Sequence, residues 1–271
     1  MPEGHTLHRL AHDLTEAFEG STLTVSSPQG RFAAGAARLN GHSFASGDAY
    51  GKHLLLAFDG LDDVLHIHLG LYGGLTLVPG AGHQVVGAVR LRLEDDAHTA
   101  DLRGPTSCVL YRPDEVEALI ARLGPDPLRP DADPEAAWRR ISASRTPIAA
   151  LLMNQEVLAG VGNVYRAEVL FRHRLDPFMP GTALDKNTWD AVWADTVHLM
   201  EHGVGSGRID TVRAEHEPGA MGRPPREDDH GGEVYVYRRS GQECLVCGTP
   251  VRTQVMSGRN LFWCPECQQR S

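Results

Sequence analysis

The sequence predicts an α+β protein of three parts: an N-terminal helix with an antiparallel β-sandwich (residues 1–121), a helical domain (122–232) and a zinc-binding hairpin (233–271). Three observations support this organisation. Apolar residues recur at helical spacing near the start, apolar and polar residues then alternate in short stretches, and two Cys-x2-Cys pairs lie near the end. Helical spacing returns in most of the region between the alternating stretches and the cysteine pairs.

The first part begins with an amphipathic segment. Residues 6–18 place Leu7, Leu10, Leu14 and Phe18 on one face of a helix, so we expect that helix to pack against the core. Residues 21–104 then alternate in short runs separated by glycine-containing turns, which is typical of antiparallel strands. A sandwich or barrel is therefore expected after the first helix.

The middle of the chain reads as a set of helices. Helical spacing occurs at five places: 114–123, 134–142, 147–158, 163–172 and 187–202. Residues 204–232 are rich in glycine, proline and charge and carry little apolar pattern, so we expect a mobile loop there.

Size and composition limit the class of protein. The 271 residues suffice for two or three compact units. No stretch approaches the roughly 18 apolar residues of a membrane span, and the start lacks a secretory leader, so we expect a soluble cytoplasmic protein. The formal net charge is −9, which weakly disfavours nucleic-acid binding, although phosphate contacts depend on local patches rather than on net charge.

The clearest chemical signal is a set of four cysteines. Cys244, Cys247, Cys264 and Cys267 form two Cys-x2-Cys pairs with 16 residues between them, a spacing that places four thiolates around one Zn²⁺. Disulfides are the weaker alternative in a chain without an export signal. Four protein ligands make this zinc structural and leave no open position for hydrolysis. Cys108 stands apart and is expected to be a buried apolar residue.

Two further segments are suited to binding a phosphate. Between the cysteine pairs, Gly258 permits a tight turn and Arg259 projects from it, either toward a phosphate or simply into solvent. Asn163 follows Gly160-Val161-Gly162 at the start of a helix, where an N-cap and free N–H groups would form an anion site. Simple helix packing is the alternative interpretation of this helical pair.

The N-terminus offers an unusual nucleophile. Methionine before proline is normally removed, which would leave Pro2 as a secondary amine with Glu3 beside it. An α-amine has a pKa of about 8, against about 10.4 for lysine, so much more of it is unprotonated at neutral pH. Such an amine attacks an aldehyde or anomeric carbon to form an iminium ion. Taken alone, the motif fits a disordered terminus better than a nucleophile.

Taken together and in this order, Pro2-Glu3, the Gly160-Val161-Gly162-Asn163 turn and the cysteine hairpin with Arg259 resemble the Fpg/Nei family of DNA glycosylases. The resemblance spans nearly the whole chain. It implies a helix–two-turn–helix element around Asn163, a DNA-binding protein that acts as a monomer on damaged double-stranded DNA, and one structural Zn²⁺.

The same resemblance assigns roles to matching residues. Pro2 would be the nucleophile that forms a Schiff base with the sugar, and Glu3 the acid that protonates the opening ring. Lys52, within Gly51-Lys52-His53, would assist base loss and β-elimination. Arg259 would clamp the phosphate at the lesion and assist δ-elimination, and Asn163 would hold the DNA backbone.

The loop 66–73 indicates the branch of the family. Leu71 and Tyr72 resemble the endonuclease VIII (Nei) branch, closest to its actinobacterial members, where such a loop fills the gap left by an extruded base. Region 204–232 also lacks the recognisable loop that caps oxidised guanine, so oxidised pyrimidines are favoured as substrates. Further DNA contacts are expected from Arg103, Arg122 and His68. The two arginines are equally compatible with structural salt bridges.

Two other classes of protein remain open. A non-catalytic DNA-binding protein on the same fold would need Asn163 and the zinc hairpin but not Pro2, Glu3 and Lys52 together. A zinc-ribbon RNA-binding or scaffold protein would explain the cysteines and the acidic charge, yet leaves Pro2 and Lys52 unexplained.

Overall fold

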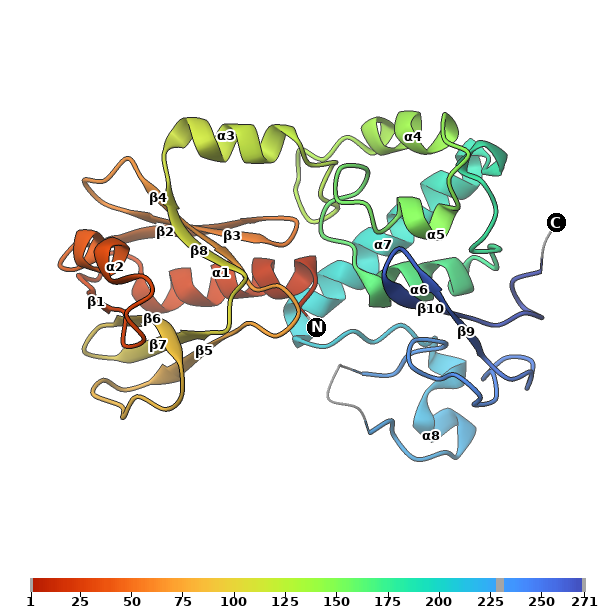
Figure 1. Cartoon of the computed structure of the whole chain (residues 1–271). Helices are drawn as coiled ribbons and strands as arrows, with labels where there is room; N and C mark the ends of the chain where they lie inside the picture. The colour runs from red at the N-terminus through yellow and green to blue at the C-terminus, as the bar shows by residue number, and fades with distance from the viewer. Residues whose placement is uncertain (1, 228–231, 270–271) are drawn as a thin grey trace. The chain divides into compact units, whose positions relative to one another are not determined.

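The computed structural model describes residues 2–227 and 232–269. The chain divides into two compact units, one ending at Arg122 and the other beginning at Leu123 (Figure 1). Each unit has its own hydrophobic core, so each is described separately.

The first unit contains one long helix, two four-stranded antiparallel sheets and two shorter helices. One sheet has the strand order β2 (Phe44–Tyr50), β3 (His53–Phe58), β4 (Val64–His68), β8 (Ser107–Tyr111). The other has the order β1 (Thr24–Ser26), β6 (Val89–Glu94), β7 (His98–Arg103), β5 (Gly74–Pro79). The helices are α1 (Gly4–Phe18), α2 (Ala33–Leu39) and α3 (Pro113–Ala121).

The core of this unit lies between α1 and the two sheets. Leu7, Leu14 and Phe18 of α1 are buried together with alternate residues of the strands, as the spacing predicts. The helix can lie close on β2 because position 47 is glycine: a Cβ there would lie 2.7 Å from the carbonyl oxygen of Ala11. The expected helix with an antiparallel sandwich is confirmed, and it fixes the first residues of the chain onto a packed surface.

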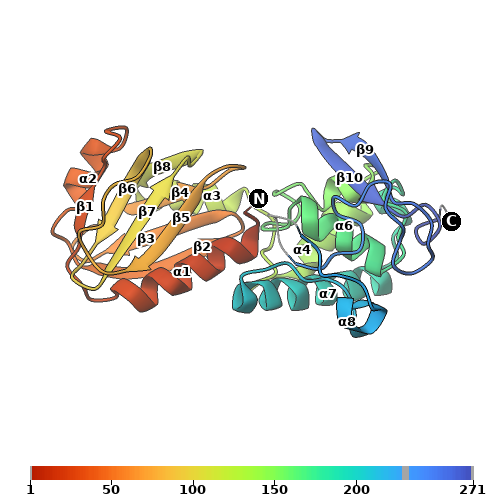
Figure 2. The ribbon, with the colours of Figure 1, turned by 90° about the horizontal axis from the view of Figure 1, so that it is seen from below.

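The second unit is helical and ends in a β-hairpin. Its elements are α4 (Pro134–Ser142), α5 (Ile148–Leu151), α6 (Asn163–Arg172), η1 (Gly181–Ala183), α7 (Lys186–Ser206), η2 (Ala214–His216), α8 (Pro218–Met221), β9 (Arg252–Met256) and β10 (Arg259–Trp263). Within this unit α6 packs on one side against α7 and on the other against β10 (Figure 2). Leu261 and Cys264 are buried in the same core as Trp189, so the hairpin is anchored to the helices.

Two expectations about the helical region are corrected. The helix predicted over 147–158 ends as α5 at Leu151, because side chains take over the backbone hydrogen bonds beyond it. Gln155 bonds to the main chain of Met153, Val161 and Gly160, which holds a series of turns instead. The stretch expected to be a loop begins later, since α7 continues to Ser206, and its described part contains η2 and α8.

Candidate active site and nucleic-acid interface

The proposed nucleophile precedes the first turn of α1. Pro2 is half-buried, Glu3 is fully buried at the N-cap, and the helix begins at Gly4. The carbonyl oxygen of Glu3 accepts from Thr6 N at 3.0 Å. The first turn is also closely packed, since His5 is buried, and this burial lowers the pKa of His5 to about 4. Pro2 and Glu3 are therefore held by a structured element rather than by a loose terminus.

Lys52 lies at the tip of the hairpin between β2 and β3. Tyr50 pairs with His53, which leaves a two-residue turn of Gly51 and Lys52. Gly51 has φ +58°, a conformation that favours glycine, and a glycine first in a two-residue turn is typical of the tight hairpins that match strand twist. Local sequence thus presents the lysine on a rigid turn.

The loop between β4 and β5 exposes two apolar side chains. Leu71 is 37% exposed and Tyr72 is 93% exposed, and Gly70 before them has φ +70°. Exposing such side chains to water costs free energy. They are therefore suited to insertion between the bases of DNA. The structure thus projects the predicted wedge residues outward, and His68 lies half-buried at the end of β4.

The two predicted arginine contacts of the first unit differ in their surroundings. The Arg103 guanidinium donates to Asp101 Oδ2 at 2.8 Å, to Thr76 Oγ1 at 3.1 Å and to Val86 O at 3.0 Å. All of these bonds lie within the first unit, so a structural role accounts for Arg103. Arg122 is exposed after α3, and its side chain forms no hydrogen bond or ion pair with any described residue.

Asn163 links α6 to the C-terminal hairpin. Its Nδ2 donates to the carbonyl oxygen of Asn260 at 3.0 Å, and its Oδ1 accepts from Arg166 at 2.6 Å. The expectation that Asn163 is the N-cap is wrong: Gly162 occupies that position and Asn163 is the first helical residue. The side chain turns toward the hairpin because buried Arg166 and Asn260 supply its partners.

Arg259 opens the strand that follows the hairpin turn. Arg259 pairs with Met256, and the two turn residues Ser257 and Gly258 have φ values of +52° and +71°. This is a two-residue turn with both central residues in the left-handed region. Among the residues that the structure describes, none bonds to the Arg259 guanidinium, which is therefore available for an anion.

The four cysteines at the base of this hairpin fit a zinc ion. All four Sγ atoms lie within 4.8 Å of one another, and the pairs Cys244–Cys267 and Cys247–Cys264 are 3.9 Å and 3.5 Å apart. Tetrahedral Zn²⁺ with bonds of about 2.3 Å requires sulfurs about 3.8 Å apart, far beyond a disulfide bond. Cys108 is buried elsewhere and burial raises the pKa of its thiol to about 12, as expected for a structural residue.

Sequence reasoning missed a buried acid on α6. Glu168 is fully buried and its carboxylate accepts from Thr211 Oγ1 and from three successive backbone N–H groups, at 2.7 to 2.9 Å, of residues 235–237. A charged residue at an apolar position of the helical pattern was the only available signal. Its effect is to fix the segment that leads into the zinc hairpin.

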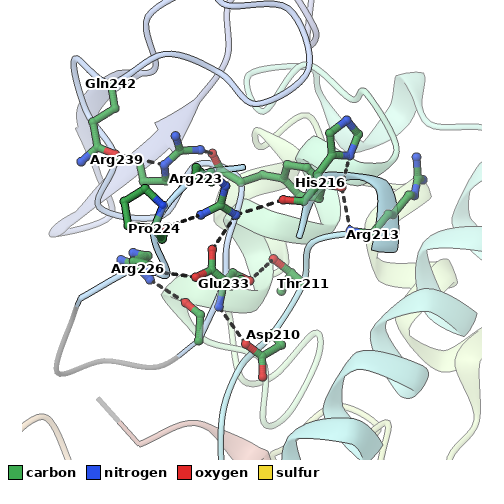
Figure 3. A network of polar contacts seen from close by, with 12 residues as sticks. Asp210, Thr211, Arg213, His216, Arg223, Pro224, Arg226, Glu233, Arg239 and Gln242 are labelled. Atoms are coloured by element: carbon green, nitrogen blue, oxygen red, sulfur yellow. Dashed lines mark hydrogen bonds and ion pairs between the residues drawn. The ribbon is translucent and has the colours of Figure 1, made fainter. Parts of the chain in front are cut away.

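A second network stabilises the chain just before that segment. Figure 3 shows Arg223 and Arg226 converging on Glu233. Arg223 Nη2 lies 2.6 Å from Glu233 Oε2, the Arg226 backbone N–H donates to Glu233 Oε1 at 2.6 Å, and Glu233 N donates to Asp210 at 2.7 Å. A hollow of about 580 Å³ lies beside it, lined among others by Arg172, His198, His202 and Arg213, and it contains no predicted site residue.

Three models of known protein families match successive parts of this chain. Residues 1–108 match the formamidopyrimidine-DNA glycosylase N-terminal domain, residues 123–214 match the H2TH domain of the same enzymes, and residues 241–270 match the zinc finger found in FPG and IleRS. Endonuclease 8 1 of Mycobacterium tuberculosis (strain H37Rv) is 50% identical over 99% of this chain and its own full length. The chain belongs to the Fpg/Nei family of DNA glycosylases.

Other members of the Fpg/Nei family support the same assignment. Formamidopyrimidine-DNA glycosylase of Parasynechococcus marenigrum is 27% identical over 99% of both chains. The structure of MutM (Fpg) from Thermus thermophilus matches with a TM-score of 0.77 and 30% identity over both full chains. Lactococcus lactis Fpg in complex with DNA containing an abasic site has the same fold, with a TM-score of 0.80, 20% identity and coverage of 99% of this chain and 100% of that one.

These findings confirm the family, the fold and the zinc finger predicted from the sequence. No helix among the described residues is both long and apolar enough to cross a membrane.

Proposed function

We propose that this protein is a bifunctional DNA glycosylase/AP lyase of base-excision repair in which the amine of Pro2 does the covalent chemistry. Three features together support the proposal. Glu3 is buried beside Pro2 at the start of a helix, and Lys52 lies on a tight turn. Asn163 donates a hydrogen bond to Asn260, the residue next to Arg259. The relatives are named as endonuclease 8 and formamidopyrimidine-DNA glycosylase.

The first chemical step is exchange of the base for the protein amine. After removal of Met1, the lone pair of the Pro2 nitrogen attacks C1′ of the extruded nucleotide, and the bond to the damaged base breaks. The base leaves with the bonding electrons and takes up the proton that the Pro2 nitrogen loses. Glu3 protonates the ring oxygen O4′ as the sugar opens, which yields a cationic iminium between Pro2 and C1′. No metal or redox cofactor enters this step, and the zinc serves only the hairpin.

Strand cleavage follows from the acidity of the iminium. Loss of a proton from C2′, assisted by Lys52, expels the 3′ phosphate by β-elimination. A second elimination expels the 5′ phosphate, with Arg259 stabilising the departing anion. Water finally hydrolyses the iminium and releases Pro2. Lysine suits this role because a guanidinium remains protonated, and Lys52 is one of only two lysines in the chain.

DNA binding is assigned to residues of both units. Leu71 and Tyr72 would fill the gap left by the extruded nucleotide, and Asn163 with Arg259 would hold its backbone. Arg122 and His68 supply further phosphate contacts, whereas Arg103 has a structural explanation in its bonds to neighbouring residues. In this scheme residues 1–121 carry Pro2, Glu3 and Lys52, residues 122–232 supply the helix–two-turn–helix contacts, and residues 233–271 form the zinc hairpin that carries Arg259.

Oxidised pyrimidines in double-stranded DNA are the proposed substrates, because Leu71 and Tyr72 resemble the endonuclease VIII branch. We further propose that the protein acts as a monomer in the cytoplasm on the nucleoid DNA.

The test is a substrate panel of labelled duplexes that contain thymine glycol, 8-oxoguanine or an abasic site. We expect faster cleavage of thymine glycol DNA than of 8-oxoguanine DNA, with phosphate at both new ends. Faster removal of 8-oxoguanine would overturn the pyrimidine preference. Binding to all three duplexes without cleavage would instead indicate a non-catalytic DNA-binding protein on this fold.

A further inference from the structure

We propose that His53 and His66 form a hydrogen-bonded pair that positions Lys52 for β-elimination, with His66 acting through His53. The inference rests on the proposed function, since Lys52 acquires its task in the proposed reaction. Neither histidine is required to touch DNA, so both are positioning residues rather than catalytic ones.

The pair lies on the face of the β2-β3-β4-β8 sheet that points away from the sandwich core. Leu55 pairs with His66 across β3 and β4, so His53, two residues earlier, projects from the same face. His53 Nδ1 and His66 Nε2 are 2.9 Å apart, and the two rings stack with centroids 5.2 Å apart. The imidazoles are thus in direct contact across neighbouring strands.

His66 is itself held from three sides. Its Nδ1 lies 3.3 Å from Ser107 Oγ on β8, and its ring stacks on Tyr111 with centroids 4.7 Å apart and an interplanar angle of 14°. Only 3% of the residue is exposed. Its ring therefore has one available orientation, and the hydrogen bond transmits that orientation to His53.

The connection from His53 to Lys52 is covalent and short. His53 directly follows Lys52, and its pairing with Tyr50 closes the two-residue turn that carries the lysine. A displaced His53 ring would shift the end of β3 and with it the turn. Because elimination needs the lysine within reach of one particular proton, a shift of about 1 Å is enough to slow the step by orders of magnitude.

The electrostatic surroundings keep both rings neutral. Burial lowers the pKa of His53 to about 3 and that of His66 to about 4. Lys52, Arg122 and His68 act on His53, and His68 acts on His66; when these neighbours are cationic, they further disfavour a positive charge on either ring. Tyr111 stacks on the His66 ring.

Neutrality determines what the pair does. Each neutral imidazole carries one N–H, so the Ser107–His66–His53 chain runs in either direction, because the serine hydroxyl both donates and accepts. Reversal changes whether His53 Nε2 is a donor or an acceptor but leaves the net charge at zero. This series of hydrogen bonds therefore fixes the orientation of the two rings and takes up no net proton.

The experiment separates Schiff-base formation from elimination on one abasic-site duplex, under single-turnover conditions. Borohydride trapping reports the attack by Pro2, and strand cleavage reports the step that needs Lys52. His66→Phe keeps an aromatic ring on Tyr111 and removes both hydrogen bonds, whereas His66→Gln retains hydrogen-bonding groups. His12→Phe, at an exposed position of α1, is the matched control.

We expect His66→Phe to slow cleavage roughly tenfold while trapping, and the protein concentration that gives the half-maximal rate, stay within about twofold of the unaltered protein. His66→Gln should recover most of the rate, and His12→Phe should change nothing. If His66→Phe fails to fold, Ser107→Ala removes only the far bond and should slow cleavage by a few-fold with normal trapping.

The inference is wrong if every folded His66 and Ser107 variant cleaves at the normal rate, or if trapping and cleavage fall together. Absence of trapping in the unaltered protein contradicts the proposed function instead, so the two failures are distinguishable.

Discussion

The side-chain amide of Asn163 donates to the carbonyl oxygen of Asn260 over 3.0 Å. This bond joins the first residue of α6 to the strand residue next to Arg259, across 97 positions of sequence. It makes the helix start and the hairpin one rigid element within the second unit. The arginine predicted to hold the phosphate is thus positioned from the helical layer as well as by zinc.

Asn163→Ala should loosen this element and weaken DNA binding. The substitution removes the bond to Asn260 and leaves the buried Arg166 guanidinium without its 2.6 Å partner. We expect a loss of about 1 to 3 kcal/mol in the free energy of unfolding, measured with urea, and weaker binding of abasic-site DNA. Asn187→Ala, at an exposed position of α7, is the control. Unchanged stability and affinity would show that the link is dispensable.

Glu168→Gln should be among the more damaging conservative substitutions in the chain. A carboxylate offers only acceptors to the three backbone N–H groups of residues 235–237, while an amide turns an NH₂ toward one of them. We expect a loss of about 2 to 4 kcal/mol, against almost none for Glu201→Gln on the surface of α7. Equal urea midpoints for the two variants would contradict this role.

Removal of zinc should affect the hairpin before it affects the first unit. Cys247→Ala is expected to abolish stoichiometric zinc, measured by mass spectrometry, and to reduce DNA affinity at least about tenfold because Arg259 loses its support. Cys108→Ala changes the one cysteine outside the cluster and should retain one zinc per chain. Retention of zinc and affinity by Cys247→Ala would reject the four-thiolate site.

Acidification should destabilise the protein through its buried histidines. The unfolded chain takes up protons on His66 and His53 below pH 6.5, whereas the folded chain does so only near pH 4 and pH 3. Their contribution to stability is therefore complete above pH 6.5 and declines as the pH falls toward 4. For His66 we expect a loss of about 1 to 2 kcal/mol between about pH 7 and pH 5.

The slope of unfolding free energy against pH is the measurement that checks this. His66→Gln should flatten the slope between pH 6.5 and 4, even though the variant is less stable throughout. His12→Gln, whose side chain is 74% exposed, should leave the slope unchanged. An equal slope in all three proteins would show that His66 is not held neutral by the fold.

The parts of the molecule that the sequence predicts are those set by local spacing. The alternating strands, the apolar face of α1 and the four cysteines follow from periodicity and ligand chemistry. Asn260, which bonds to Asn163, and the partners of Glu168 and His66 lie far away in the sequence, and no local pattern encodes them. The shorter α5 has a different cause, because the bonds of the Gln155 side chain to residues five and six positions later replace helical ones, and the apolar spacing does not reveal such bonds.

The role of Pro2 is tested most directly by locating the covalent bond. The protein would be trapped on abasic-site DNA with borohydride and digested, and the modified peptide would be sequenced by mass spectrometry. The account predicts a chain that begins at Pro2 with the sugar remnant on its nitrogen. A remnant on Lys52, or trapping by a chain that retains Met1, would contradict it.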